Sequence, residues 1–164
     1  MTESKLTVGA KAPAFSLTAD DGKTVTLADF KGKTVVVYFY PKADTPGCTR
    51  ESCDFRDEIA VFHKHAAEVL GVSKDAVPAL QKFKQKYDLP FPLLSDPDHG
   101  VQAAYGAWGT KNLYGKLVEG TIRSTVLIGP DGKILKRWAK VKVEGHAAEV
   151  LEALRQTRST APGS

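Results

Sequence analysis

The sequence predicts one α/β domain in which helices cover a mixed β-sheet. The chain has 164 residues, 42% of them hydrophobic and 26% charged, which is typical of one soluble domain. Segments with the composition of strands alternate with segments of helical periodicity, and two Asp-Gly dipeptides separate short strand pairs. Because the chain has neither an internal repeat nor a linker, we expect residues 1–164 to form a single domain, with a disordered tail from about residue 158.

An N-terminal β-hairpin is predicted around Asp21-Gly22. Apolar and polar residues alternate over 15–18 and 24–27, and glycine tolerates the positive φ of a tight turn. The run TVVVYFY, residues 34–40, is continuous, β-branched and aromatic, as in a strand that is buried on both faces. It should therefore be a central strand, ended by Pro41.

The rest of the chain continues the alternation of helices and strands. A helix is predicted over 49–67, with Phe55, Ile59, Phe62 and Ala66 at helical spacing. The remaining predicted elements, in order, are a strand (68–72), a helix (77–87), an edge strand limited by its prolines (91–94), a short helix (98–105), a hairpin around Asp131-Gly132 (124–128 and 134–138) and an amphipathic helix (145–156).

Charge and hydropathy exclude several classes of function. The net charge is +4, but basic and acidic residues are interleaved, and the densest basic stretch, 133–142, alternates with apolar residues as a half-solvated strand does. We therefore expect no nucleic-acid binding. No run of about 18 apolar residues occurs, and the first residues lack the apolar middle of a secretory signal. We expect a cytoplasmic monomer that does not bind membranes.

The two cysteines, Cys48 and Cys53, are where function should be sought. They are too few for a disulfide scaffold, and in a reducing compartment a close pair indicates redox or metal chemistry. Thr45 is suited to the N-cap of the following helix and Pro46 to its first position, which places Cys48 in the first turn. There the unpaired amides and the helix dipole favour a thiolate over a thiol.

The two sulfurs should face in different directions. At ~100° per residue, Cys48 lies within about 20° of the apolar stripe and Cys53 roughly 160° away from it. Cys48 therefore faces the body of the protein, where a free cysteine is often only a small buried hydrophobe. Five helical residues separate the Cα atoms by about 8.6 Å, beyond the ~7 Å that a disulfide spans. A bond between the two cysteines would require the first turns of the helix to unwind.

Attack on a peroxide is one redox reaction open to such a thiolate, and it would need more than ionisation of the sulfur. When sulfur attacks one peroxide oxygen, the other gains negative charge, so the site needs donors: loop amides, a hydroxyl and a fixed cation. Thr45 supplies a nearby hydroxyl, but composition alone does not say which cation completes the set.

The segment YPKADTPGCTRESCDFRD, residues 40–57, resembles the active-site segment of peroxiredoxins, specifically of the bacterioferritin-comigratory or Q-type subfamily. The family pattern Pro-x-x-x-Thr-x-x-Cys matches Pro41, Thr45 and Cys48, and the subfamily's resolving cysteine matches Cys53. The resemblance extends over roughly residues 6–154 and includes WGTKNLYGKLVEGTIRSTVLIGPDGKI, in which the family's active-site arginine corresponds to Arg123.

The resemblance implies a thioredoxin-like fold and the reduction of hydrogen peroxide and organic hydroperoxides. Cys48 would attack the peroxide, Cys53 would resolve the product as an internal disulfide, and thioredoxin would recycle the enzyme without a metal or organic cofactor. Val126 and Gly129 depart from the family pattern, where Phe and Asp are commoner, which bears on local packing more than on chemistry.

Each of three residues near this site has two possible interpretations. From the residues alone, Arg123 would be a surface ion pair at the start of a strand, and only the resemblance assigns it to the site. Glu51 either orients Arg123 or simply favours the helix dipole, and we leave it outside the catalytic set. Tyr40 either lines the pocket or is a buried aromatic residue at a strand end.

A metal site is one alternative to a peroxidase. The cysteine pair is followed by His63 and His65, four potential zinc ligands in all. These histidines would be ~200° apart on a helix and cannot converge on one ion. His99 and His146 have no partner at ligand spacing and are expected at the surface.

A thioredoxin-like disulfide oxidoreductase, or a redox-regulated binding protein of the same fold, is the other alternative. A reductase is expected to carry Cys-x-x-Cys, whereas four residues separate Cys48 from Cys53. The spacing therefore favours the peroxidase.

Overall fold

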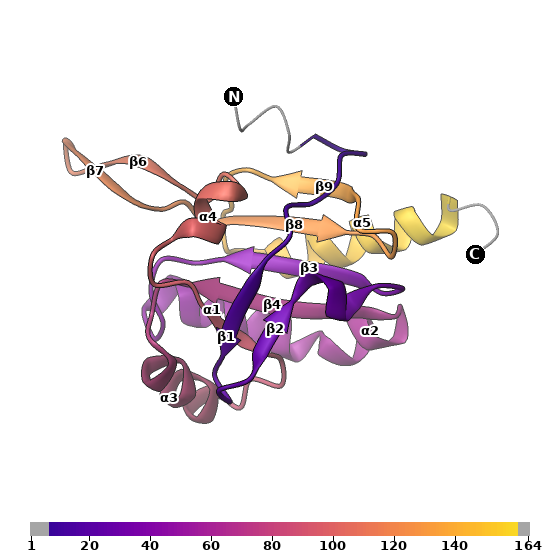
Figure 1. Ribbon diagram of the computed structural model, residues 1–164, viewed down its shortest axis with the longest axis horizontal. Helices are drawn as coiled ribbons and strands as arrows, with labels where there is room; N and C mark the ends of the chain where they lie inside the picture. The colour runs from indigo at the N-terminus through magenta and orange to yellow at the C-terminus, as the bar shows by residue number, and fades with distance from the viewer. Residues whose placement is uncertain (1–6, 161–164) are drawn as a thin grey trace.

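Seven strands form one mixed β-sheet in the computed structural model, which describes residues 7–160 (Figure 1). In chain order they are β1 (Ser16–Ala19), β2 (Thr24–Thr26), β3 (Thr34–Phe39), β4 (Ala67–Ser73), β5 (Leu93–Ser95), β8 (Ser124–Ile128) and β9 (Ile134–Trp138). Their order across the sheet is β2-β1-β5-β4-β3-β8-β9, and β4 is parallel to β3 and β5 while the other neighbours are antiparallel. The predicted mixed sheet and N-terminal hairpin are confirmed.

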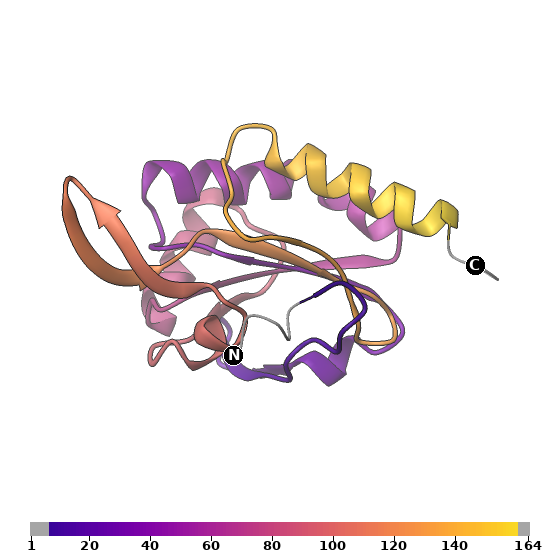
Figure 2. The same ribbon diagram turned by 90° about the horizontal axis from the view of Figure 1, so that it is seen from above.

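Helices cover both faces of this sheet. They are η2 (Leu27–Phe30), a 3-10 helix, and α1 (Pro46–Asp57), α2 (Ile59–Lys64), α3 (Val77–Tyr87), α4 (Gly100–Ala104) and α5 (His146–Thr160). Figure 2 shows the sheet nearly edge-on, with α1, α2 and α5 on one face and α4 on the other. Among the described residues, no helix is long and apolar enough to cross a membrane.

The strand β3 is central, as its composition predicts. All six of its residues are buried, and it lies between β4 and β8. Because side chains alternate along a strand, Val36 and Tyr38 pack into the core beneath α1 and α5, while Val35 and Val37 pack into the core on the opposite face. Two cores thus fix the strand whose end leads to Cys48.

The structure corrects the single helix predicted over 49–67. Glu58 interrupts it between α1 and α2, with φ −104° and ψ 4°. Phe55 and Phe62 still share one buried face, with ring centroids 5.8 Å apart, so the apolar periodicity continues through the break and does not reveal it. The predicted end is also wrong, because Ala66 has a left-handed φ of 56° and β4 starts at the next residue.

The edge position predicted for the strand at 91–94 is wrong. The observed strand, β5, lies inside the sheet between β1 and β4. Pro90 and Pro92 both come before its first residue, so neither removes a hydrogen bond from the strand ladder.

A second, two-stranded sheet was not predicted. It consists of β6 (Trp108–Leu113) and β7 (Lys116–Thr121), which project from the body as a ribbon (Figures 1 and 2). Gly109 and Gly120 lie opposite each other in it, and glycines inside strands weaken the sequence signal. This ribbon returns the chain to β8 through residues 122–123.

The C-terminal helix is longer than predicted. α5 reaches Thr160 rather than ending at residue 156, so the tail expected to be disordered from about residue 158 begins within the helix. Residues 161–164 of that tail lie outside the described residues. His146, expected at the surface, is 1% exposed, because its ring packs edge-on against Phe55 and Trp138.

Candidate active site

Cys48 lies in the first turn of α1, as predicted. Thr45 occupies the N-cap position with extended backbone angles, and Pro46 is the first helical residue. The Thr49 amide donates to the Thr45 carbonyl oxygen at 2.8 Å, which closes the first helical turn. The Cys48 side chain is 1% exposed and belongs to the core, so its predicted inward orientation is confirmed.

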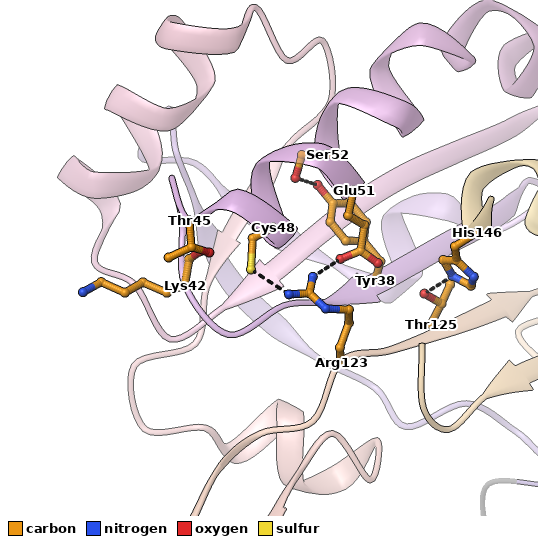
Figure 3. A network of polar contacts seen from close by, with 9 residues as sticks. All are labelled: Tyr38, Lys42, Thr45, Cys48, Glu51, Ser52, Arg123, Thr125 and His146. Carbon is orange, nitrogen blue, oxygen red and sulfur yellow. Dashed lines mark hydrogen bonds and ion pairs between the residues drawn. The ribbon is translucent and has the colours of Figure 1, made fainter. Parts of the chain in front are cut away.

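Arg123 contacts the sulfur of Cys48. Ser124 pairs with the last residue of β3, and this register places the preceding arginine beside the start of α1. Nη2 of Arg123 donates to Sγ of Cys48 at 3.2 Å, and Nη1 donates to Oε1 of Glu51 at 2.6 Å (Figure 3). A Cβ atom at position 47 would lie 3.3 Å from Nη2, so the glycine there leaves room for the guanidinium. Arg123 is therefore not a surface ion pair.

Of the two interpretations given above for Glu51, the structure favours the first: its carboxylate orients Arg123. Its side chain is 1% exposed, and Oε2 has no hydrogen-bond partner among the described residues. Burial raises the pKa of Glu51 to about 7, and the neighbouring Arg123 moderates this rise. The sequence offered one signal for this role of Glu51, namely its spacing. A residue three positions after Cys48 lies on nearly the same helix face.

The loop before α1 holds the other predicted site residues. The Thr45 hydroxyl donates to the carbonyl oxygen of Lys42 at 2.8 Å and makes no cap hydrogen bond to the helix (Figure 3). Pro41 is half-buried and follows Tyr40, whose ring is fully buried and stacks on Tyr38 at 5.4 Å. Tyr40 is thus a core aromatic residue.

Cys53 lies on the outer side of α1, as predicted, and is partly exposed. Partial burial raises the pKa of its thiol, while the nearby Arg56 acts in the opposite direction. Both cysteines are free, so the structure represents the reduced protein.

The histidines do not form a metal site with the cysteines. Nε2 of His63 lies 3.2 Å from the Glu68 carboxylate, away from both sulfurs. Within residues 7–160, no three His, Cys, Asp or Glu side chains are grouped to hold a metal ion. His146 instead bonds Thr125 at 2.8 Å and Glu149 at 3.0 Å.

Comparison with known proteins decides the family. The AhpC/TSA family model matches residues 8–137. The chain belongs to the AhpC/TSA family, among the peroxiredoxins of the Bcp or Q type. It is 54% identical to the putative peroxiredoxin Bcp of Coxiella burnetii over 147 residues, 90% of this chain and 97% of that protein. It is 48% identical to peroxiredoxin Bcp of Bacillus subtilis over 148 residues, 90% of this chain and 94% of that one.

Solved structures agree with this assignment. Peroxiredoxin Q of Xanthomonas campestris is 44% identical with a TM-score of 0.83, covering 87% of this chain and 90% of the other. A structure of the bacterioferritin comigratory protein of the same species, 43% identical over the same shares with a TM-score of 0.83, comes from work on its alkyl peroxide reduction activity. A cysteine-to-serine variant of PrxQ from Xylella fastidiosa is 36% identical with a TM-score of 0.87, covering 93% of this chain and 98% of the other.

Membership confirms the thioredoxin-like fold and makes this peroxiredoxin a thiol peroxidase, an enzyme with a peroxide substrate and a thiol reductant. The two departures from the family pattern lie in or after β8, outside the Cys48–Arg123 contact. Val126 is fully buried, and a Cβ atom at position 129 would approach Leu135 to 3.3 Å. Both therefore concern packing.

Proposed function

We propose that Cys48 is the peroxidatic nucleophile, Cys53 the resolving thiol, and Arg123, Thr45 and Pro41 the residues that complete the active site. The observation that supports this most is the 3.2 Å contact between Arg123 Nη2 and Cys48 Sγ in the first turn of a helix. A buried sulfur with a guanidinium donor differs from an inert core cysteine, which packs only against apolar groups.

In the first step, the Cys48 thiolate attacks the terminal oxygen of a hydroperoxide. The S–O bond forms as the O–O bond breaks, and the leaving oxygen takes a proton to give an alcohol, or water from hydrogen peroxide. Sulfur is thereby oxidised to a sulfenic acid. Arg123 donates to the charge that develops on the oxygens, and Pro41 closes the loop beside them. Thr45 contributes its hydroxyl, which would accept from the peroxide or turn from the Lys42 carbonyl oxygen to donate to it.

In the second step, the Cys53 thiolate attacks the sulfenic sulfur. The S–S bond forms, the S–O bond breaks, and the departing hydroxide takes a proton to give water. A dithiol protein then reduces this disulfide by thiol–disulfide exchange and becomes oxidised itself. We infer that thioredoxin or a similar dithiol protein fills this role, because Cys53 is partly exposed and can be reached from solvent.

We further propose that residues 1–164 act as one domain and as a cytoplasmic monomer. The candidate site supports this, because its residues come from one chain: the loop before α1, α1 itself and the segment before β8. A reducing cytoplasm would supply the thiol reductant that the catalytic cycle needs.

The test is peroxide consumption coupled to thioredoxin and its reductase, in wild type and in each cysteine variant. We expect turnover by wild type and none by Cys48→Ser, because a serine hydroxyl does not ionise at neutral pH. Cys53→Ser should complete a single round of peroxide reduction, because it lacks the thiol that resolves the sulfenic acid. Insulin reduction, measured in parallel, distinguishes a disulfide reductase.

Substantial peroxide turnover by Cys48→Ser would overturn the assignment of the nucleophile. Sustained thioredoxin-dependent turnover by Cys53→Ser would overturn that of the resolving thiol. Wild-type turnover with glutathione and glutaredoxin but not with thioredoxin would change only the reductant.

A further inference from the structure

A carboxylate outside the candidate site holds the loop that leads to Cys48. Oδ2 of Asp75, in the connection between β4 and α3, accepts a hydrogen bond from the Ala43 amide at 2.7 Å. The same oxygen accepts one from the Ser73 hydroxyl at 2.8 Å, and the Asp75 carbonyl accepts one from the Ser95 hydroxyl at 2.7 Å. Asp75 is therefore fixed at both its side chain and its backbone.

This contact is more buried than the one that Asp44, the next residue of the loop, makes with α3. Asp44, with a left-handed φ of 59°, accepts from the Tyr87 hydroxyl at 2.7 Å and from Lys86 Nζ at 2.9 Å. Asp44 and Lys86 are exposed, and exposed ion pairs contribute little. The bond from Ala43 to Asp75 is partly buried and charge-assisted, the kind that is shorter and stronger than a neutral one.

We propose that Asp75 is a positioning residue for the peroxidatic cysteine, acting through the Ala43 amide. Only Asp44 separates Ala43 from the N-cap of α1 at Thr45. Fixing this amide therefore fixes the entry of the chain into the helix, and with it the place of Cys48 relative to Arg123. A misplacement of about 1 Å at a reacting atom can slow a reaction by about 10²-fold.

Asp75 acts on Cys48 by holding the loop in place and not through an electrostatic effect of its charge on the sulfur. A negative charge near the site would disfavour the Cys48 thiolate, so a purely electrostatic effect would have the opposite sign. Asparagine keeps an acceptor oxygen at the same place and loses the charge, whereas alanine and serine cannot reach the Ala43 amide. The inference rests on the proposed role of Cys48, which the coupled assay tests separately.

The experiment measures the oxidation of Cys48 by hydrogen peroxide in a Cys53→Ser background, where Cys48 is the single thiol. Quenched-flow samples are alkylated and the remaining thiol is quantified by mass spectrometry. We expect Asp75→Ala and Asp75→Ser to lower the second-order rate constant by about 10-fold or more, toward the limit set by a 1 Å misplacement. Asp75→Asn should stay within about threefold of the parent.

Asp20→Ala is the matched control. Asp20 also holds a backbone amide, that of Leu93 at 3.0 Å, and pairs with Lys84 at 3.2 Å, but it lies in the β1–β2 turn. Its loss should lower the free energy of unfolding and leave the rate constant of Cys48 unchanged. This comparison separates a positioning effect from general destabilisation.

Three results would contradict the proposal: parental rates in folded Asp75→Ala and Asp75→Ser, an Asp75→Asn rate as low as that of the alanine variant, or an equal loss of rate in Asp20→Ala. If the alanine and serine variants do not fold, hydrogen exchange decides. The Ala43 amide of the reduced parent should be protected, and exchange as fast as in an open loop would overturn the proposal. If the parent itself fails to react with peroxide, the proposed function fails instead.

Discussion

At the scale of single residues, the site combines a reactive sulfur with a carboxylate that is costly to bury. Glu51 reaches Arg123 at 2.6 Å, yet its second oxygen has no hydrogen-bond partner among the described residues. A buried carboxylate is stable only with a partner of opposite charge, so Glu51 and Arg123 hold each other in place. The arrangement favours one orientation of the guanidinium at the expense of stability.

The pH dependence of stability should reveal this cost. The pKa of Glu51 is raised by burial from 4.5 to about 7, so between these values the unfolded state ionises while the folded state keeps its proton. The free energy of unfolding contributed by Glu51 should therefore fall as pH rises, by about 3 kcal/mol in total. Urea unfolding of the reduced protein should show this fall in wild type relative to Glu51→Gln. Parallel curves from pH 4 to about 8 would contradict it.

Arg123→Ala should slow the reaction of Cys48 with peroxide by about 10² or more, since it removes a donor to developing negative charge. Arg123→Lys keeps the charge without the planar fork and should recover only part of the rate. Lys140→Ala is a matched control, because Lys140 lines the same pocket of about 410 Å³ as Arg123. Stopped-flow measurement should place the control near wild type. A wild-type rate in Arg123→Ala would return the arginine to a structural role.

At the scale of elements, α1 has to open before the two cysteines can bond. Five helical residues separate their Cα atoms by about 8.6 Å, more than the ~7 Å that a disulfide allows, and Cys48 faces the core while Cys53 faces outward. The second half of α1 is anchored by Phe55, whose ring packs against Tyr38 at 4.8 Å and Phe62 at 5.8 Å. The stretch before Phe55, from Thr45 to about Cys53, is the part that can unwind.

Hydrogen exchange on reduced and oxidised protein should locate this unwinding. Amides from Cys48 to Asp54 should lose protection on oxidation, while those of α2, beyond the break at Glu58, keep theirs. The reduced Cys53→Ser variant, treated identically, controls for effects of the reagents. An oxidised protein that contains the internal disulfide but shows unchanged protection throughout α1 would exclude the unwinding.

At the scale of the whole molecule, sequence predicted what depends on local pattern. The run at 34–40 is β-branched and aromatic, so β3 was placed correctly in the centre, and the helix α3 was predicted with its observed bounds. Cys48 was placed in the first turn because Thr45 and Pro46 mark a helix start. These features need only neighbours along the chain.

Features that depend on tertiary pairing were not predictable in the same way. The contact of Arg123 with Glu51 exists because β8 pairs with β3 in one register, and no local pattern encodes that register. β5 lies inside the sheet for a similar topological reason. His146 was predicted at the surface because the residues that surround its ring, Thr125, Phe55 and Trp138, lie in other strands and helices. The likeness to peroxiredoxins supplied Arg123 where the residues alone favoured a surface ion pair.

The proposed mechanism requires that one molecule of peroxide oxidises Cys48, and that Cys53 of the same chain then forms a disulfide with it. Trypsin separates the two, because it cleaves after Lys42, Arg50 and Arg56 to give ADTPGCTR and ESCDFR. The most direct test treats the reduced protein with one equivalent of hydrogen peroxide, blocks free thiols and maps the peptides by mass spectrometry. We predict that these two peptides appear linked by a disulfide in monomeric protein, and that the link is absent in Cys48→Ser. Two separately alkylated peptides after complete consumption of the peroxide, or a link only between chains, would contradict the account.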